Sequence, residues 1–262
     1  MRIYLAVTPD NLREAACRSV RLAHAAYRID PRSHLIRQEP PFRAEGDLML
    51  LSDEGSSCTD RQNLCREILR ECGSRGFSGV TADFTQPPTP DRRAFLSSLN
   101  RTLQQNRLTL FLPEEYAAIG GTALLCTALS GGSFRRRLEE TVERYGTNRV
   151  ALDLQRLCMR FPLPCPEGEG EPLTQEAFSD LFRQLTPSVF YSSDLCARYF
   201  TYSQNGKHFF VLFDDADTLL QKVRIGQELG VATGFFMYPE VSDLLTELFP
   251  RSPRPQRAKN NR

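Results

Sequence analysis

The chain of 262 residues contains no tryptophan and only three histidines. Its charge is nearly balanced, because 33 Lys and Arg residues oppose 32 Asp and Glu residues and leave a formal net charge of +1. So small a net charge creates no strong field for collecting nucleic acid or an anionic membrane surface. We therefore expect no nucleic-acid partner.

Long apolar runs are also missing. No stretch approaches the roughly 20 apolar residues that a membrane span requires. The opening residues, MRIYLAVTPDNLRE, have only a short apolar run before Asp10, which does not fit a secretory signal peptide. We therefore predict a cytoplasmic chain with no membrane span, in which the eight cysteines stay reduced.

Several motifs of catalysis and metal binding are absent. The sequence has no Cys-x-x-Cys or His-x-x-x-His pair, no nucleophile elbow and no nucleotide-binding glycine loop. Cys58, Cys65 and Cys72 recur every seven residues, a spacing that suits a packing face of a helix as well as a metal stripe. We expect neither a metal ion nor another cofactor.

Short apolar runs alternate with amphipathic stretches along most of the chain. This alternation is typical of parallel strands joined by helices, and it predicts an α/β fold, a TIM (β/α)8 barrel occupying residues 1–250 as one domain. The eight strand candidates are residues 3–7, 34–38, 47–51, 79–83, 108–112, 123–127, 150–154 and 234–238. Residues 251–262 are basic and almost without apolar side chains, so we expect a disordered tail.

Helix starts are marked by capping patterns. Thr59 and Gln62 form a capping box, and Leu173 before Thr174 can staple onto Phe178. Apolar stripes at 95–103, 134–142 and 219–229 indicate further helices, so that each strand is expected to have a covering helix.

One interruption of the pattern predicts an antiparallel insertion. The dipeptide Asn205-Gly206 separates two aromatic and β-branched runs, which is a strong signal for a hairpin over about 198–213.

The end of the chain carries a resemblance to a known family. Residues 201–223 read TYSQNGKHFFVLFDDADTLLQKV, and residues 228–238 read ELGVATGFFMY. This order of hairpin, Asp-Asp segment, Leu-x-x-Lys helix and last strand resembles glycoside hydrolase family 18, especially its branch of spore-associated peptidoglycan hydrolases. Upstream, RGFSGVTADFT resembles the fourth barrel strand of that family, and RLTLFLPEEYAAIGG resembles the fifth.

The resemblance implies that the catalytic motif is degenerate. The four acidic positions of the fourth strand in that family fall here on Ser78, Thr81, Asp83 and Thr85, so only Asp83 remains acidic. The last position holds the family's proton donor, and a threonine hydroxyl cannot supply a proton near neutral pH. Losing general acid catalysis typically costs about 10² to 10⁴ in rate.

The resemblance also implies altered contacts to the sugar. The sixth strand of the family supplies a tyrosine to the reacting N-acetyl group, whereas ALLCTALSGG has neither Tyr nor Asp. The closing tryptophan of the family is replaced by Tyr238.

Candidate ligand-binding residues lie at the predicted ends of strands, where function gathers in this fold. Asp83 is the first candidate, and the alternative is a residual acid held by its neighbours. Aromatic and acidic side chains near other strand ends can stack against a sugar or replace the missing acid, but rim packing and solvated surface explain them as well: Phe84, Tyr116, Tyr238, Glu114, Glu115, Glu240, Asp53 and Glu54.

Three functions remain open. The first is a catalytically degenerate relative, a pseudoenzyme that binds an N-acetylglucosamine-containing glycan, a peptidoglycan fragment or a protein partner at the barrel mouth. The second is an active glycoside hydrolase with a relocated carboxylate. The third is a structural protein of a spore layer, without enzymatic activity.

Overall fold

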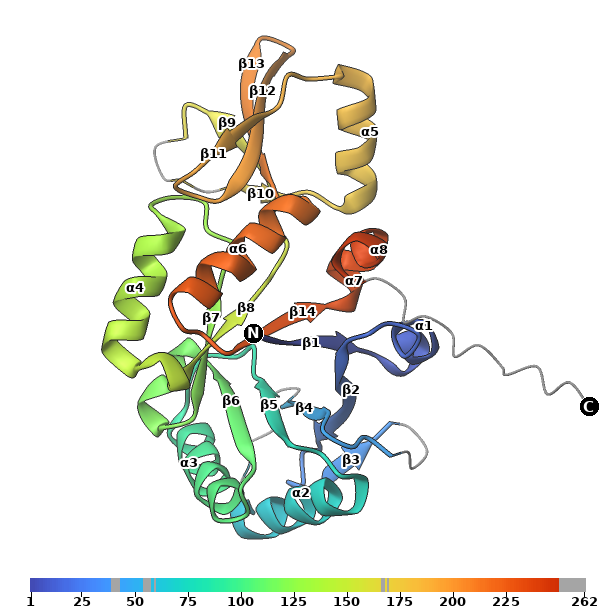
Figure 1. Ribbon diagram of the computed structural model, residues 1–262, viewed down its shortest axis with the longest axis vertical. Coiled ribbons are helices and arrows are strands. Elements are labelled where there is room, and N and C mark those ends of the chain that lie inside the picture. Colours follow the sequence, from blue (N-terminus) through green and yellow to red (C-terminus); the bar gives the residue numbers. More distant parts are fainter. Residues whose placement is uncertain (39–42, 54–57, 59, 166–167, 169, 250–262) are drawn as a thin grey trace, which may run out of the picture.

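The computed structural model describes residues 1–38, 43–53, 58, 60–165, 168 and 170–249. Eight parallel strands form a closed barrel, because β1 pairs with both β14 and β2 and thereby joins the two ends of the sheet (Figure 1). The predicted TIM barrel is confirmed. Its strands are β1 (Arg2–Val7), β2 (Arg21–Ile29), β4 (Leu48–Ser52), β5 (Gly79–Asp83), β6 (Thr109–Pro113), β7 (Thr122–Cys126), β8 (Val150–Asp153) and β14 (Thr233–Met237).

The second barrel strand differs from the sequence prediction. Residues 34–38 contain only β3 (Leu35–Arg37), which pairs antiparallel with β2 outside the ring. The barrel strand is β2 itself, which reads RLAHAAYRI. Three of its nine residues are alanines, which are weak strand formers, so its composition did not indicate the strand that pairs with β1 and β4.

Helices cover most of the barrel, but not after every strand. Within the described residues between β2 and β4 there is no helix, and only a short 3₁₀ segment, η2, follows β6; the prediction of a helix for each strand is wrong at these two places. The helical elements of the barrel are η1 (Pro9–Asn11), α1 (Leu12–Ala15), α2 (Arg61–Arg75), α3 (Pro90–Gln105), η2 (Glu114–Ile119), α4 (Phe134–Tyr145), η3 (Thr147–Arg149), α6 (Ala216–Glu228), α7 (Tyr238–Val241), η4 (Ser242–Leu244) and α8 (Leu245–Leu248). None of the helices in the described part of the chain is long and apolar enough to cross a membrane.

The predicted helix starts are placed by side-chain caps. Thr59 lies outside the described residues, and α2 is capped by Asp60, whose Oδ1 accepts a hydrogen bond from the Asn63 amide at 3.2 Å. Thr174 caps α5 (Gln175–Leu185) by accepting from the amide of Ala177, as the sequence predicted.

A five-stranded antiparallel sheet is inserted between β8 and α6, and it stands above α4 and α6 in Figure 1. The predicted hairpin is present within it as β12 and β13, with Asn205 and Gly206 both at positive φ in the turn. Helix α5 packs on one face of the sheet, mainly through Phe178 against Phe213. The strands are β9 (Cys158–Leu163), β10 (Glu171–Pro172), β11 (Phe190–Ser192), β12 (Ala197–Gln204) and β13 (Lys207–Phe213).

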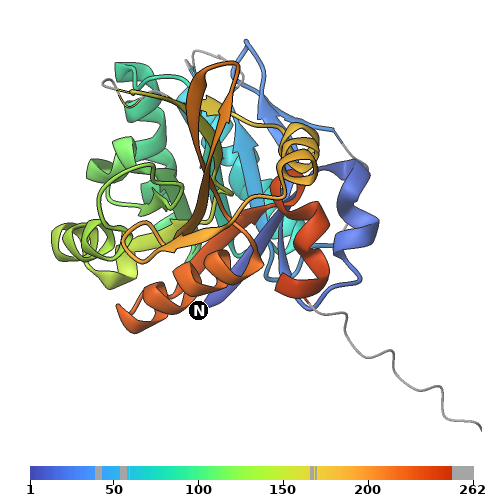
Figure 2. The same cartoon turned by 90° about the horizontal axis from the view of Figure 1, so that it is seen from above.

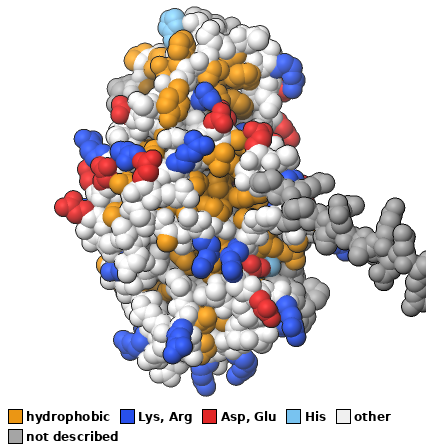
Figure 3. Space-filling model, in the orientation of Figure 1, with side chains coloured by type: hydrophobic (Ala, Val, Ile, Leu, Met, Phe, Trp, Pro, Cys, Tyr) orange, Lys and Arg blue, Asp and Glu red, His pale blue; other side chains and the backbone are white. Residues whose placement is uncertain are grey.

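The surface of this inserted sheet is partly apolar. Figure 3 shows hydrophobic side chains at the top of the molecule, over the inserted sheet. Phe190 and Tyr191 of β11 are 53% and 48% exposed. In the view from above in Figure 2, the inserted sheet lies in front of the barrel, in agreement with its place at the top of Figure 1.

A buried ion pair joins the insertion to the barrel. Asp214 follows β13, and both its oxygens accept from Lys222 Nζ of α6, at 2.9 and 2.7 Å. Thr218 Oγ1 donates to Asp214 Oδ1 at 2.8 Å, and the Leu157 amide donates to Oδ2 at 2.9 Å. Both charged side chains are completely buried. This pair fixes where the chain re-enters the barrel.

Candidate functional site at the barrel mouth

The fourth barrel strand, β5, aims alternate side chains into the barrel. Thr81 and Asp83 line a cavity at the carboxyl ends of the strands, as the period of two along a strand requires, and Thr85, two residues past the end of β5, lines it too. Residues 80, 82 and 84 belong to the apolar layer beneath α2 and α3. The predicted register of this strand is therefore confirmed.

Ser78 lies at the opposite end of the barrel from the mouth. Its Oγ donates to the carbonyl oxygens of Gly46 and Asp47, at 3.0 and 3.1 Å. This first motif position therefore links two chain segments at the barrel floor and does not reach the cavity that holds Asp83.

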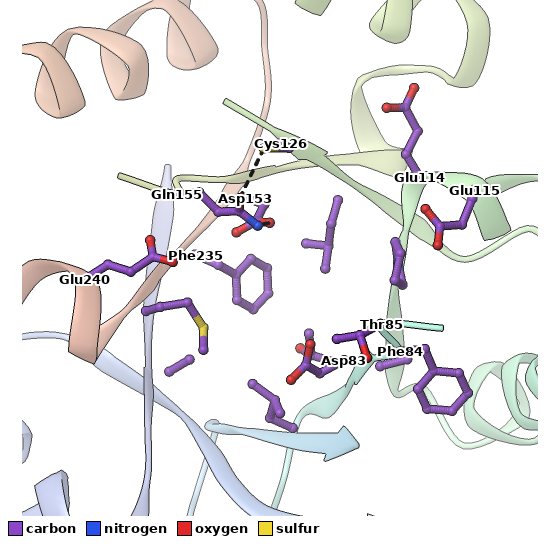
Figure 4. A pocket seen from close by; sticks show the side chains of 17 residues that line it. Asp83, Phe84, Thr85, Glu114, Glu115, Cys126, Asp153, Gln155, Phe235 and Glu240 are labelled. Atoms are coloured by element: carbon purple, nitrogen blue, oxygen red, sulfur yellow. Dashed lines mark hydrogen bonds between the residues drawn. The ribbon is translucent and has the colours of Figure 1, made fainter. Parts of the chain in front are cut away.

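The cavity has a volume of about 590 Å³, which suits a small ligand. Its wall is acidic, and among the described residues that line it there is no Lys, Arg or His. Figure 4 shows Asp83, Asp153 and Glu240 on different sides of the pocket, whereas the carboxyl group of Glu114 points away from its middle. The acidic residues are Asp83, Glu114, Glu115, Asp153 and Glu240, and the apolar floor includes Ala6, Leu50, Leu124, Phe235 and Met237.

Asp83 is exposed to the open cavity at the end of β5. The surrounding walls remove part of its water, and this desolvation, followed by the charge of Asp53, raises the pKa of Asp83. Asp53 itself is 2% exposed and pairs with Arg92, whose Nε lies 2.6 Å from its Oδ2. Asp53 is thus a structural partner behind the wall and not a substitute acid in the mouth. Glu54 lies outside the described residues.

Asp153 is a mouth residue that the sequence interpretation missed. It ends β8, and burial raises its pKa to about 6, with further contributions from the charges of Glu240 and Asp83. Its hydrogen-bond partner is neutral, because Gln155 Nε2 donates to Asp153 Oδ2 at 2.8 Å. The signal was present in the sequence, since an acid ends the apolar run VALD just as Asp83 ends GVTAD.

The three predicted glutamates do line the cavity, but two of them have partners of their own. Glu114 Oε2 is 2.6 Å from an Arg137 guanidinium nitrogen. Glu240 Oε2 accepts from the Arg156 amide at 2.9 Å, although burial still raises the pKa of Glu240. Glu115 is exposed at the rim.

Two of the three predicted aromatic platforms, Tyr116 and Tyr238, do not line the mouth. Tyr116 is completely buried, with its ring edge against Phe84, and Phe84 is itself only 3% exposed. Tyr238 is 8% exposed, and its hydroxyl donates to Glu14 Oε2 at 2.7 Å. The expectation that these rings face a sugar is therefore wrong for Tyr116 and Tyr238. Two aromatic residues line the cavity, Phe84 and Phe235, and Phe84 is nearly buried.

No cluster of three or more His, Cys, Asp or Glu side chains with the geometry of a metal site occurs in the part of the chain that the structure describes.

Comparison with known proteins gives a fold and no closer relationship. No protein-family model matches the chain, and no curated protein matches it in sequence. Solved structures match over nearly its full length. The spore cortex-lytic enzyme SleL of Bacillus megaterium is 17% identical, with 97% of this chain and 75% of that chain covered and a TM-score of 0.61.

Two chitinases match similarly. A chitinase from Chromobacterium violaceum is 14% identical, with 90% of this chain and 93% of that chain covered and a TM-score of 0.65. A family 18 chitinase from Cycas revoluta, determined in complex with (GlcNAc)3, is 13% identical, with 95% and 98% covered and a TM-score of 0.63. At these identities the likeness shows the fold alone. The chain has the barrel fold of glycoside hydrolase family 18, which confirms the predicted resemblance at that level.

Proposed function

We propose that this chain is a catalytically degenerate barrel of the family 18 type, which binds an amino-sugar glycan of the N-acetylglucosamine-containing kind at its mouth. The observation that carries the proposal is the open cavity of about 590 Å³ that Asp83, at the end of β5, and Thr85 both line. The cavity suits a ligand, while the position of the family's proton donor holds a hydroxyl group.

The cavity has the chemistry that sugars need. Carboxylates accept hydrogen bonds from sugar hydroxyls, and Asp83, Asp153 and Glu115 offer them around one opening. The apolar floor at Phe235 and Met237 can cover the less polar face of a sugar ring. The likeness to a chitinase determined with (GlcNAc)3 supports this ligand class.

The missing acid argues against ordinary hydrolysis by the family's route. Thr85 cannot protonate a leaving oxygen. The sixth barrel strand, β7, ends in Cys126 and has no tyrosine, although the resemblance implies a tyrosine from this strand in family members. Each loss removes a contribution to transition-state stabilisation, and general acid catalysis alone is worth about 10² to 10⁴ in rate.

Binding and turnover should be measured together on the full chain. Isothermal titration with an N-acetylglucosamine hexamer should give saturable binding, and chromatography of the same mixture should show intact hexamer. Release of shorter sugars at about 1 s⁻¹ or faster, the range of ordinary enzymes, would refute a non-catalytic role. An absence of binding would favour the structural role in a spore layer.

A second candidate function is hydrolysis with a relocated acid, and a specific observation favours it. A general acid works best when its pKa lies near the working pH, and the pKa of Asp153 is raised to about 6. If the hexamer is cleaved, Asp153→Asn should abolish cleavage. Glu139→Gln, which removes one exposed charge on α4, should leave it unchanged.

A further inference from the structure

We propose that the mouth selects a glycan unit with a free, protonated amine, as in a de-N-acetylated glucosamine residue, and that Asp83 and Asp153 pair with this ammonium group. The inference rests on the proposed glycan-binding function and names the kind of sugar that the same cavity prefers.

The first argument is the charge of the cavity wall. Two of the lining acids have partners within the protein, since Glu114 pairs with Arg137 and Glu240 accepts from the Arg156 amide. Asp83 and Asp153 form no ion pair with a basic side chain within the described residues. Two carboxylates without a cation in one cavity repel each other, and a cationic ligand relieves that repulsion.

The second argument is an unpartnered hydroxyl deeper in the same cavity. Thr81 is 4% exposed, lines the cavity two residues before Asp83, and its Oγ1 has no hydrogen-bond partner among the described residues. A buried polar group without a partner costs about 1–3 kcal/mol. A ligand donor that reaches Thr81 Oγ1 would remove this cost, and an ammonium group has three N–H donors to share.

The third argument concerns the acetyl group. The resemblance implies that family members hold the N-acetyl group through a residue of the sixth barrel strand. Here that strand is β7, which ends in Cys126, and Cys126 Sγ donates to Gln155 Oε1 at 3.4 Å. No tyrosine or aspartate remains in that strand to hold an acetamide. An acetamide offers one N–H donor and an acceptor oxygen, whereas an ammonium group offers three N–H donors and a positive charge, so the ammonium group complements Asp83 and Asp153 better.

The test compares two tetramers, one of N-acetylglucosamine and one of glucosamine, by isothermal titration with the full chain at about pH 6 and moderate salt. We expect the glucosamine tetramer to bind about 10-fold more tightly, a factor in keeping with one charge-assisted contact. Asp83→Asn and Asp153→Asn should each weaken binding of the glucosamine tetramer more than binding of the acetylated tetramer, and should thereby remove most of this preference.

Two further variants separate a specific contact from general charge attraction. Glu139→Gln removes an exposed carboxylate that is not among the lining residues and should preserve the preference. Thr81→Val keeps the shape of the side chain and should weaken binding of the glucosamine tetramer without lowering the melting temperature. A loss of preference in Glu139→Gln as large as in Asp153→Asn would reduce the effect to the overall charge of the protein and overturn the inference.

The outcomes distinguish this inference from the proposed function. Equal binding of both tetramers, or tighter binding of the acetylated one, overturns the selection for a free amine but leaves glycan binding intact. Failure of both tetramers to bind overturns the two proposals together. A preference that survives in both Asn variants places the ammonium elsewhere and refutes the assignment of Asp83 and Asp153.

Discussion

Asp214 and Asp153 both lie at the end of a strand, but their carboxylates differ in burial and in the partners that the protein provides. Asp214 is fully buried and saturated, with contacts to Lys222, Thr218 and the Leu157 amide. Asp153 is partly buried, and it accepts a hydrogen bond from the neutral amide of Gln155. An acid that serves the fold has all its partners inside the protein, whereas the incomplete shell around Asp153 leaves room for a ligand. The following changes test that distinction, beginning with the largest expected effect.

Breaking the saturated pair should be the most damaging change. Lys222→Met leaves Asp214 buried without its cation, and such a loss typically destabilises a protein by about 3–5 kcal/mol. Urea denaturation of the variant measures this cost. Adding Asp214→Asn to Lys222→Met should recover part of the stability, because no charge then stays buried. A cost below about 1 kcal/mol for Lys222→Met would show that Asp214 does not depend on its partner.

Removing the charge of Asp153 should stabilise the folded protein, whereas breaking the Asp214–Lys222 pair should destabilise it. Its pKa is raised from an ordinary 3.8 to about 6 in the folded protein, so the folded state holds its proton more tightly than the unfolded state does. Stability from this group is therefore complete below about pH 4 and is lost as the pH rises through about 6. Asp153→Asn should be about 1–3 kcal/mol more stable than the natural chain at pH 8, allowing for the open cavity, and nearly equal to it at pH 4.

The control for that measurement is Glu139→Gln, which should behave alike at both pH values because Glu139 is exposed. Denaturation curves at pH 4 and pH 8 for the three proteins give the comparison. If Asp153→Asn is destabilised at pH 8, the carboxylate has a stabilising partner and resembles Asp214 after all.

Removing the unpartnered hydroxyl of Thr81 should change the stability by a smaller amount. Thr81→Val exchanges a buried hydroxyl without a partner among the described residues for a methyl group of similar size, which should raise stability by up to about 1 kcal/mol in the free protein. Differential scanning calorimetry checks the change. A loss of more than about 1 kcal/mol would mean that the hydroxyl already bonds within the protein.

The half-exposed pair between Glu114 and Arg137 should matter least. Its side chains are 26% and 39% exposed, and pairs of this kind contribute about 0–1 kcal/mol. Glu114→Gln should therefore shift the urea midpoint only slightly, and a shift as large as that of Lys222→Met would contradict the ranking.

The sequence predicts the barrel strands well where a buried strand appears as a short apolar run. Strands such as VALD and GVTAD are short apolar runs. The alternation of side chains along a strand predicts that Asp83 and Thr85 face the cavity, and both residues line it. The prediction fails at β2, because this strand is rich in alanine and only its pairing with β1 and β4 identifies it as a barrel strand. Strand β9 is also hidden, because its pairing with β13 joins residues about 50 positions apart.

Side-chain direction beyond the strand ends could not be predicted in the same way. Tyr116 lies in η2 and Tyr238 begins α7, so the period of two no longer applies to them. Their rings follow the turns of these short helices into the apolar layers. Asp153 was missed for a different reason. The predicted strand 150–154 runs one residue past the end of β8, so Asp153 fell inside the predicted strand, although it is the last strand residue and every parallel strand delivers its last residue to the same mouth.

The most direct test of a mouth that binds without cleaving is a crystal structure of the full chain soaked with a glucosamine tetramer. We predict density for an unbroken saccharide in the cavity, with an amine nitrogen between Asp83 and Asp153 and within hydrogen-bond distance of both carboxyl groups or of Thr81. An empty mouth at saturating saccharide, or a cleaved sugar beside Asp153, would contradict a binding site without catalysis.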